Sequence, residues 1–189
     1  MNTKWLASLA MLGALAAPLQ AQSGVYAGVQ WTGASLTYRG AAENLDFGGG
    51  FGLHAGAQLG SSFGVLVNYD KNTLGASGGD TDLGQWDVLG RLSFVGLGPV
   101  RSYLTAGVTG RKSTSSWYDG TRGAFDFSGT NPTAGLTAQM MLTSKLAVDG
   151  GVLWTFGRFN QTHGYSTSRV EATGSRVSVG VSYFLLGGR

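Results

Sequence analysis

Apolar and polar side chains alternate along most of this chain. In residues 176–185 the apolar side chains occupy every second position, at Val177, Val179, Val181 and Tyr183. Successive side chains of a β-strand point to opposite sides, so this period of two predicts a strand with one apolar and one polar face. The same pattern recurs in further segments, namely residues 25–32, 51–60, 63–70, 85–94, 101–109, 133–142 and 146–156.

The connections between these eight predicted strands alternate between short and long. Short turns are expected at residues 60–62, 96–99 and 143–145, and polar loops are expected at residues 34–47, 71–83, 111–129 and 158–170. An even number of strands joined in this way is typical of bacterial membrane barrels, whose short turns face the periplasm and whose long loops face outside. The pattern therefore predicts an all-β fold, an eight-stranded antiparallel up-and-down transmembrane β-barrel with its termini in the periplasm.

The polar faces of the strands indicate which side of the barrel meets water. They consist mainly of glycine, serine, threonine and glutamine, and charged residues make up only 12% of the whole chain. A face exposed to water normally carries more charge, whereas small residues suit the narrow interior of an eight-stranded barrel. We therefore expect the apolar faces to point outward into lipid. The alternative is a secreted lipocalin-like carrier, whose apolar faces would line an internal site for apolar ligands.

Large aromatic side chains lie near both ends of the predicted strands. Phe63 and Tyr69 are six positions apart, which corresponds to roughly 20 Å along a strand. The apolar band of a membrane barrel is about 25 Å tall and carries an aromatic girdle at each edge. We expect the girdles to contain Trp31, Phe63, Tyr69, Trp86, Phe94, Trp154, Phe156 and Tyr183.

The first 21 residues differ from the rest of the chain. Lys4 precedes an apolar run over residues 5–17, and Pro18 and the small residue Ala21 follow it. A cation, an apolar run and a small-residue cleavage site in this order are typical of a secretory signal peptide, and the run is too short for a spanning helix. We therefore expect a signal peptide at residues 1–21 and one barrel domain at residues 22–189. The chain has no cysteine, so disulfide bonds do not stabilise it.

The last predicted strand carries a second pattern. A polar residue, a glycine, an aromatic and a hydrophobic residue follow one another at Ser178, Gly180, Tyr183 and Leu185. This spacing resembles the closing-strand signal that the assembly machinery of bacterial outer-membrane barrels reads, although chains of that kind usually stop at the final hydrophobic residue. With the strand pattern and the signal peptide, the motif makes the chain similar to the OmpA/OmpX-type family of small outer-membrane barrels, without a peptidoglycan-binding domain.

The resemblance implies a location and a set of partners. The protein is expected in the outer membrane as a monomer, in contact with outer-membrane lipid and with the barrel assembly machinery. Its expected role is envelope integrity or a surface interaction such as adhesion. A narrow porin-like channel for ions or small solutes is the alternative.

Charged residues on the polar faces indicate what fills the lumen. A charge left unpaired in a low-dielectric interior costs several kcal/mol. We therefore expect a salt-bridge network that plugs the barrel and contains Asp87, Arg91, Arg101, Asp149 and Arg176, whereas Asp70 is expected nearer the outer rim and outside this network. Such a network is compatible with a permanent plug and with a gate.

The sequence does not favour catalysis. A nucleophile needs a base within reach and a third group that orients the base. His54 has no serine and acid nearby in a family-like arrangement, and His163 stands beside Thr162, Tyr165 and Ser166, which do not by themselves form such an arrangement. No cofactor or metal motif is present, and the formal net charge of +3 is too small to favour nucleic acid as a partner.

One expected loop carries candidate contacts for a surface partner. Aromatic and charged residues stand close together within it, at Trp117, Tyr118, Phe125 and Phe127 and at Arg111, Lys112, Asp119 and Arg122. Because aromatic residues are enriched in interfaces, this loop is a candidate binding surface for a protein or a polysaccharide. The alternative is that these residues extend the neighbouring strands beyond the membrane and pack on one another.

Overall fold

Eight long strands make up nearly all of the described structure. The computed structural model describes residues 23–39, 44–76, 79–97, 99–117, 125–163 and 169–187. The strands are β1 (Gly24–Arg39), β2 (Asn44–Leu59), β3 (Phe63–Ala76), β4 (Gly79–Leu97), β5 (Val100–Trp117), β6 (Phe125–Met141), β7 (Leu146–His163) and β8 (Arg169–Gly187). This described part holds no helix of the length and apolar character that a membrane crossing needs. The expected signal peptide, residues 1–21, lies outside the described residues.

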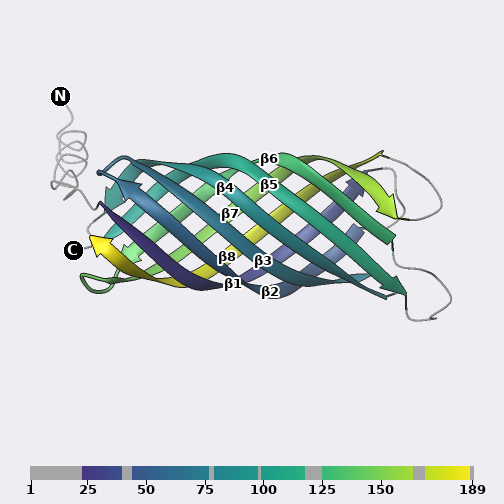
Figure 1. Ribbon diagram of the computed structural model, residues 1–189, viewed down its shortest axis with the longest axis horizontal. Helices are drawn as coiled ribbons and strands as arrows, with labels where there is room; N and C mark the ends of the chain where they lie inside the picture. Colours follow the sequence, from purple (N-terminus) through teal and green to yellow (C-terminus); the bar gives the residue numbers. More distant parts are fainter. Residues whose placement is uncertain are drawn as a thin grey trace, which may run out of the picture.

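The strands form one closed antiparallel barrel (Figure 1). Each strand pairs with the next one in sequence, and β1 also pairs with β8, for example at Val29 and Val181. Closure gives each of these eight strands two neighbours, so their backbone N–H and C=O groups pair within the ring. The fold class predicted from the sequence is confirmed.

The two ends of the barrel differ. Gly24 and Gly187, where β1 begins and β8 ends, lie at one end together with tight connections such as residues 60–62. Gly60 has a φ of 70° there, a left-handed conformation that glycine adopts without steric cost. We call this end the turn end and the opposite end the loop end.

The strands reach further toward the loop end than the hydrophobic pattern predicts. β3 and β4 stay paired from Phe63 opposite Leu92 to Ala76 opposite Gly79, although the pattern predicts a loop there. The loop boundaries predicted at residues 34–47, 71–83, 111–129 and 158–170 are therefore wrong. The hydrogen bonds of an antiparallel ladder join backbone groups, so the strands continue where their outward side chains are already polar.

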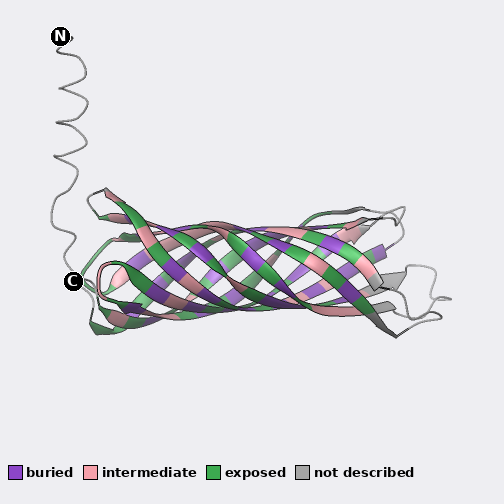
Figure 2. Ribbon diagram, turned by 90° about the horizontal axis from the view of Figure 1, so that it is seen from above, coloured by how far each residue is buried: buried purple, intermediate pink, exposed green. Residues whose placement is uncertain are grey.

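Side chains alternate between the outside and the inside of the barrel, which Figure 2 shows as alternating exposed and buried positions along each strand. On the outside, the Phe51 side chain is 76% exposed. On the inside, Asp70 and Asp87 are fully buried. The exposed apolar side chains form a belt that reaches from Leu59, Phe63 and Leu186 near the turn end to Trp31, Tyr69 and Trp86 on the loop side. Because the apolar faces point outward, the lipocalin-like alternative is wrong.

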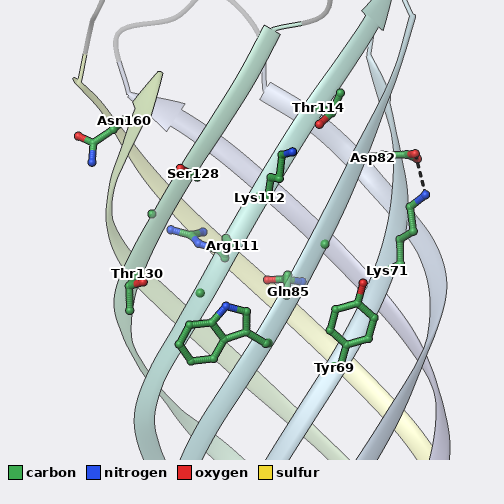
Figure 3. Close-up of a pocket in the computed structure, with 14 residues that line it drawn as sticks. Tyr69, Lys71, Asp82, Gln85, Arg111, Lys112, Thr114, Ser128, Thr130 and Asn160 are labelled. Atoms are coloured by element: carbon green, nitrogen blue, oxygen red, sulfur yellow. Dashed lines mark ion pairs between the residues drawn. The ribbon is translucent and has the colours of Figure 1, made fainter. Parts of the chain in front are cut away.

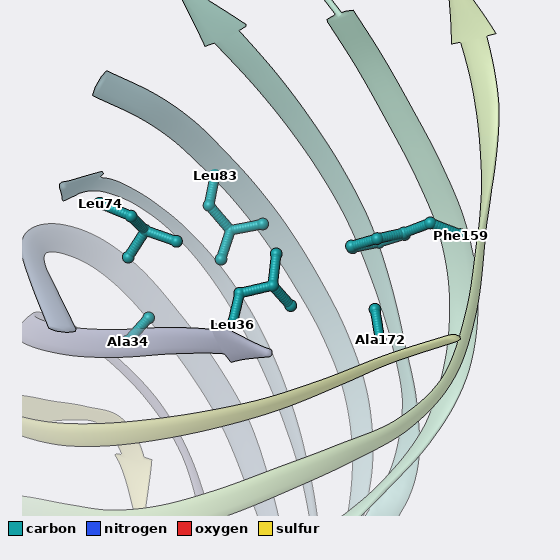
Figure 4. Close-up of a cluster of buried hydrophobic side chains, with 6 residues drawn as sticks. All are labelled: Ala34, Leu36, Leu74, Leu83, Phe159 and Ala172. Carbon is teal, nitrogen blue, oxygen red and sulfur yellow. The ribbon is translucent and has the colours of Figure 1, made fainter. Parts of the chain in front are cut away.

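The interior of the barrel is filled in layers. A turn-end cluster of apolar side chains contains Tyr26, Leu66, Leu89, Ala147, Leu153 and Phe184. A loop-end cluster contains Ala34, Leu36, Leu74, Leu83, Phe159 and Ala172 (Figure 4). Buried polar and charged side chains lie between the two clusters, and they form the candidate site in the lumen.

Candidate functional site

The charged centre of the lumen joins three strands. Arg176 of β8 reaches across the barrel and donates from Nη1 to Asp70 Oδ1 of β3 and from Nη2 to Asp87 Oδ2 of β4. The Arg176 side chain is 6% exposed and neither carboxylate is exposed. The prediction that Asp70 stays outside the network is wrong, because β3 continues as a strand past this residue and keeps it on the inner face with Asn68.

Neutral donors satisfy the other lone pairs of the two carboxylates. Asn72 and Gln85 donate hydrogen bonds to Asp70. Asn68 and Thr109 donate hydrogen bonds to Asp87. The four donor–acceptor distances lie between 2.5 and 3.2 Å. A buried ion pair is tolerated only when such additional hydrogen bonds replace the water that its groups have lost. The centre is therefore a hydrogen-bonded unit and not an isolated salt bridge.

A second buried polar group lies closer to the turn end. Ser182 Oγ lies 2.6 Å from His54 Nε2 and donates to Asp149 Oδ2, which is 3.6 Å from the same histidine nitrogen. Gln139 Nε2 donates to the other oxygen of Asp149 at 2.7 Å. A Cβ atom on Gly28 of β1 would lie 2.6 Å from His54 Nε2, so this glycine lets the histidine of β2 reach the serine of β8.

This group corrects the prediction that His54 has no serine and acid nearby. The order of the contacts still differs from a catalytic triad, in which the carboxylate accepts from histidine Nδ1 and orients the ring. Here Asp149 accepts from the serine, and His54 Nδ1 is buried without a hydrogen-bond partner among the described residues.

The predicted five-residue network is divided between separate groups. Arg176 and Asp87 form an ion pair, whereas Asp149 binds Ser182 and Gln139. Arg91 Nη1 donates to the Tyr26 hydroxyl at 2.5 Å, and its guanidinium lies 4.0 Å from the centre of the Tyr103 ring. Arg101 is buried nearer the turn end. All five side chains are inside the barrel, but the prediction that they form one network of salt bridges is wrong, because the pairing depends on which strands face each other across the lumen.

Arg111 is a buried lumen residue that the hydrophobic pattern places in a loop. Its guanidinium lies 4.5 Å from the centre of the Phe159 ring, and Nη2 donates to Asn131 Oδ1 at 2.8 Å and to the Ala172 carbonyl at 3.1 Å. The alternation of β5 contains the signal for this position, since Arg111 follows the inward-facing Thr109 by two residues.

The candidate binding loop is only partly described. Phe127 points into the barrel, where its ring centre lies 5.9 Å from that of Tyr38. Lys112 points outward and is exposed. The prediction of an exposed binding surface is wrong for Arg111 and Phe127. Outside the described residues lie Tyr118, Asp119 and Arg122 and the side chains of Trp117, Phe125 and His163.

The predicted girdle residues all face outward, with exposures between 41% and 57%. Phe63, Phe94 and Tyr183 lie toward the turn end, and Trp31, Tyr69, Trp86, Trp154 and Phe156 lie toward the loop end. Tyr69 of β3 is directly opposite Trp86 of β4. The belt therefore has aromatic side chains toward both of its edges.

A groove of about 710 Å³ lies on the outside of the barrel at the loop-side edge of the belt (Figure 3). Its floor consists of two rows across β3, β4 and β5: Tyr69, Trp86 and Gly110 nearer the belt, and Lys71, Gly84 and Lys112 beyond them. We call it the interfacial groove. Lys71 Nζ pairs with Asp82 Oδ2 at 3.0 Å, and this hydrogen bond lowers the pKa of Asp82 below its usual range.

The family follows from a comparison of the whole sequence. The model of the outer membrane protein beta-barrel domain matches residues 6–183. The chain belongs to this family. The protein is therefore an outer-membrane barrel whose belt faces lipid and whose loop end faces outside the cell. A search of curated protein sequences finds no match.

Solved structures of small outer-membrane barrels share the fold. Neisserial surface protein A has a TM-score of 0.64 and 16% identity, over 85% of this chain and 97% of that one. OprG from Pseudomonas aeruginosa has a TM-score of 0.62 and 12% identity, over 88% and 97%. Ail of Yersinia pestis has a TM-score of 0.57 and 14% identity, over 88% and 99%. At these identities the similarity supports the architecture and not a shared role.

The proposed closing signal lies on the strand that completes this outer-membrane barrel. Ser178, Gly180, Tyr183 and Leu185 belong to β8, which pairs with both β7 and β1. Recognition of these residues by the assembly machinery stays a prediction.

Proposed function

We propose that this protein is an outer-membrane barrel with a closed lumen, which acts in envelope integrity or surface interaction through its outer surfaces and not through transport or catalysis. The observation that carries this proposal is the contact of Arg176 with Asp70 and Asp87 across the barrel. The turn-end and loop-end clusters fill the lumen on either side of this contact.

The energetics of these layers oppose the passage of ions. A permeating ion would have to separate Arg176 from two buried carboxylates, and unpaired buried charges cost several kcal/mol. The same ion would also lose its water beside the two apolar clusters. The small internal cavity beside His54 and Asp149 has a volume of about 20 Å³, which is room for about one water molecule. These features support a plug over a channel.

A surface role is supported by the part of the barrel that extends beyond the belt. There the strands continue with polar side chains on the outside, among them Lys71, Lys112 and Arg158. One barrel of this fold, Ail of Yersinia pestis, is described in complex with the heparin analogue sucrose octasulfate. Binding of a polar ligand is thus compatible with the fold.

Planar bilayer recording of the purified protein tests the closed lumen. We expect no conductance above that of the bare bilayer, because the charged centre and the apolar clusters fill the lumen. The protein denatured by boiling serves as the control for detergent artefacts. Discrete current steps that the native protein gives and the boiled protein does not would instead support the narrow channel.

A further inference from the structure

Four buried polar side chains line one internal cavity of the barrel. The cavity has a volume of about 20 Å³, and its lining includes Gln30, His54, Asn68 and Arg91. These four residues are between 2% and 8% exposed. In the described part of the chain, no hydrogen bond reaches Gln30 Nε2, His54 Nδ1, Asn68 Oδ1 or Arg91 Nε. A buried polar atom without a hydrogen bond destabilises the folded state, so four such atoms around one cavity indicate a polar occupant.

The hydrogen bonds of Ser182 determine where His54 carries its proton. An ionised carboxylate only accepts hydrogen bonds, so the Ser182 hydroxyl donates its single hydrogen to Asp149 Oδ2. The Ser182 oxygen can then only accept from His54 Nε2, which lies 2.6 Å away. His54 therefore carries a proton on Nε2. In the neutral ring the other nitrogen, Nδ1, is an acceptor that needs a donor.

With a neutral His54 ring, the four atoms divide equally into donors and acceptors. Gln30 Nε2 and Arg91 Nε donate, and His54 Nδ1 accepts. Asn68 Oδ1 also accepts, because the Asn68 amide nitrogen already donates to Asp87 Oδ2 at 2.9 Å. A water molecule can accept two hydrogen bonds and donate two, and it fits a cavity of this volume. A halide ion only accepts, so it would leave both acceptors without a donor.

We propose that the lumen binds one structural water molecule in this cavity. The water accepts hydrogen bonds from Gln30 Nε2 and Arg91 Nε, and it donates hydrogen bonds to His54 Nδ1 and Asn68 Oδ1. Each of the four atoms thereby gains the partner that it lacks among the protein groups. The inference does not rest on the proposed function, because a lumen closed to ions does not require this water.

The water extends the charged centre toward the turn end. Asn68 donates to Asp87 of the charged centre, whereas His54 contacts Ser182, which donates to Asp149. With the water between Asn68 and His54, one chain of hydrogen bonds runs from Asp87 of β4 to Asp149 of β7. A buried polar network whose members are all satisfied makes the interior more rigid. The two polar groups of the lumen thus act as one unit.

Crystal structures of the detergent-purified protein and of two variants test the water. In the unaltered protein we expect one density peak within about 3.2 Å of the four atoms. The Q30M variant removes one of the two donors, so we expect a lower occupancy of the peak. The matched control is Q58M, because Gln58 is another buried glutamine, at the turn end of β2, where it donates to the Gly60 carbonyl at 3.4 Å. Heat-dependent mobility in SDS confirms that each variant is folded.

Nitrogen-15 NMR of the protein with labelled histidine tests the position of the proton on His54. The chain has two histidines, so the H163Q variant identifies the signals of His54. We expect a neutral ring with hydrogen on Nε2 and none on Nδ1. A ring with hydrogen on Nδ1, whether neutral or doubly protonated, would overturn the proposal because Nδ1 could not accept from the water.

Three crystallographic outcomes would also overturn the proposal. In the first, the unaltered protein shows no density peak in the cavity. In the second, Q30M and Q58M show the peak with equal occupancy, which would remove the role of Gln30. In the third, crystals soaked in sodium bromide show an anomalous bromide signal in the cavity, which would assign the four side chains to an anion.

Discussion

The side chain of Arg176 connects opposite walls of the barrel. It starts from β8 and reaches Asp70 on β3 and Asp87 on β4. Four neutral hydrogen bonds hold the carboxylates in place. All of these groups have lost their hydration. Removal of the arginine would therefore leave two buried carboxylates without a counter-charge, which destabilises the folded state.

Replacing Arg176 with methionine leaves two buried carboxylates without a counter-charge. We expect the R176M variant to lose about 3–5 kcal/mol of unfolding free energy, measured by urea unfolding in lipid vesicles with tryptophan fluorescence. The control is R158M, whose partner Glu171 lies 3.2 Å away in an ion pair with side chains 63% and 47% exposed. Loss of this exposed pair is expected to cost less than about 1 kcal/mol.

A triple variant separates charge from packing. In D70N/D87N/R176M no charge remains at the centre, so most of the lost stability should return. Equal stability of R176M and R158M would contradict the buried pairing, and so would a triple variant that is no more stable than R176M.

At the scale of elements, an aromatic side chain lies over a glycine on the neighbouring strand. Trp86 of β4 is opposite Gly110 of β5, and a Cβ atom on this glycine would overlap the indole ring. The glycine therefore lets the ring pack against β5 at the loop-side edge of the belt. Such aromatic cover over a glycine also fixes the register of neighbouring strands.

Alanine at position 110 should displace the Trp86 ring. We expect G110A to shift the tryptophan emission and to lower the unfolding free energy by about 1–3 kcal/mol, the usual cost of overpacking. G90A is the matched control on β4, since a Cβ atom there would lie 3.7 Å from the Ala106 carbonyl oxygen, an ordinary contact. An unchanged emission spectrum in G110A would contradict this packing.

At the scale of the whole molecule, the seam between β1 and β8 turns a sheet into a barrel. Gly180 lies at this seam opposite Gln30. A Cβ atom on Gly180 would lie 2.6 Å from the Val29 carbonyl oxygen and 2.9 Å from Gln30 Cβ. Gly180 of the closing-strand pattern is therefore needed for close packing of β8 against β1, whether or not the assembly machinery also recognises it.

Valine at position 180 should interfere with closure. Closed barrels resist SDS until they are heated, because their backbone hydrogen bonds are satisfied within the ring. We expect G180V to reduce the fraction of protein whose mobility in SDS changes on boiling, whereas V181I, a change at a neighbouring outward-facing position that is 43% exposed, should leave this fraction unchanged. The same fraction in both variants would contradict a steric role for Gly180.

The positions of the strands and the direction of their faces could be predicted from the sequence. The alternation of Val177, Val179 and Val181 is a local property of the chain, and it identifies β8 without knowledge of its partners. The extent of the strands could not be predicted in the same way. Beyond the belt the outward faces of β3 and β4 become polar, whereas Leu74 and Leu83 point inward, so the outward hydrophobic pattern ends while the backbone pairing continues to Ala76 and Gly79.

The sequence by itself thus determined the number of strands and the aromatic residues of the belt, because alternation is a local property of each strand, and the composition of the polar faces taken together favoured an outward apolar face. Only the tertiary structure decided which charges meet. Arg176 and Asp70 are 106 positions apart, and they come together because the tilt and stagger of all eight strands bring them to the same height in the lumen. The same geometry aligned Lys71 with Lys112 on the outside, since a row across a barrel is a property of the whole ring.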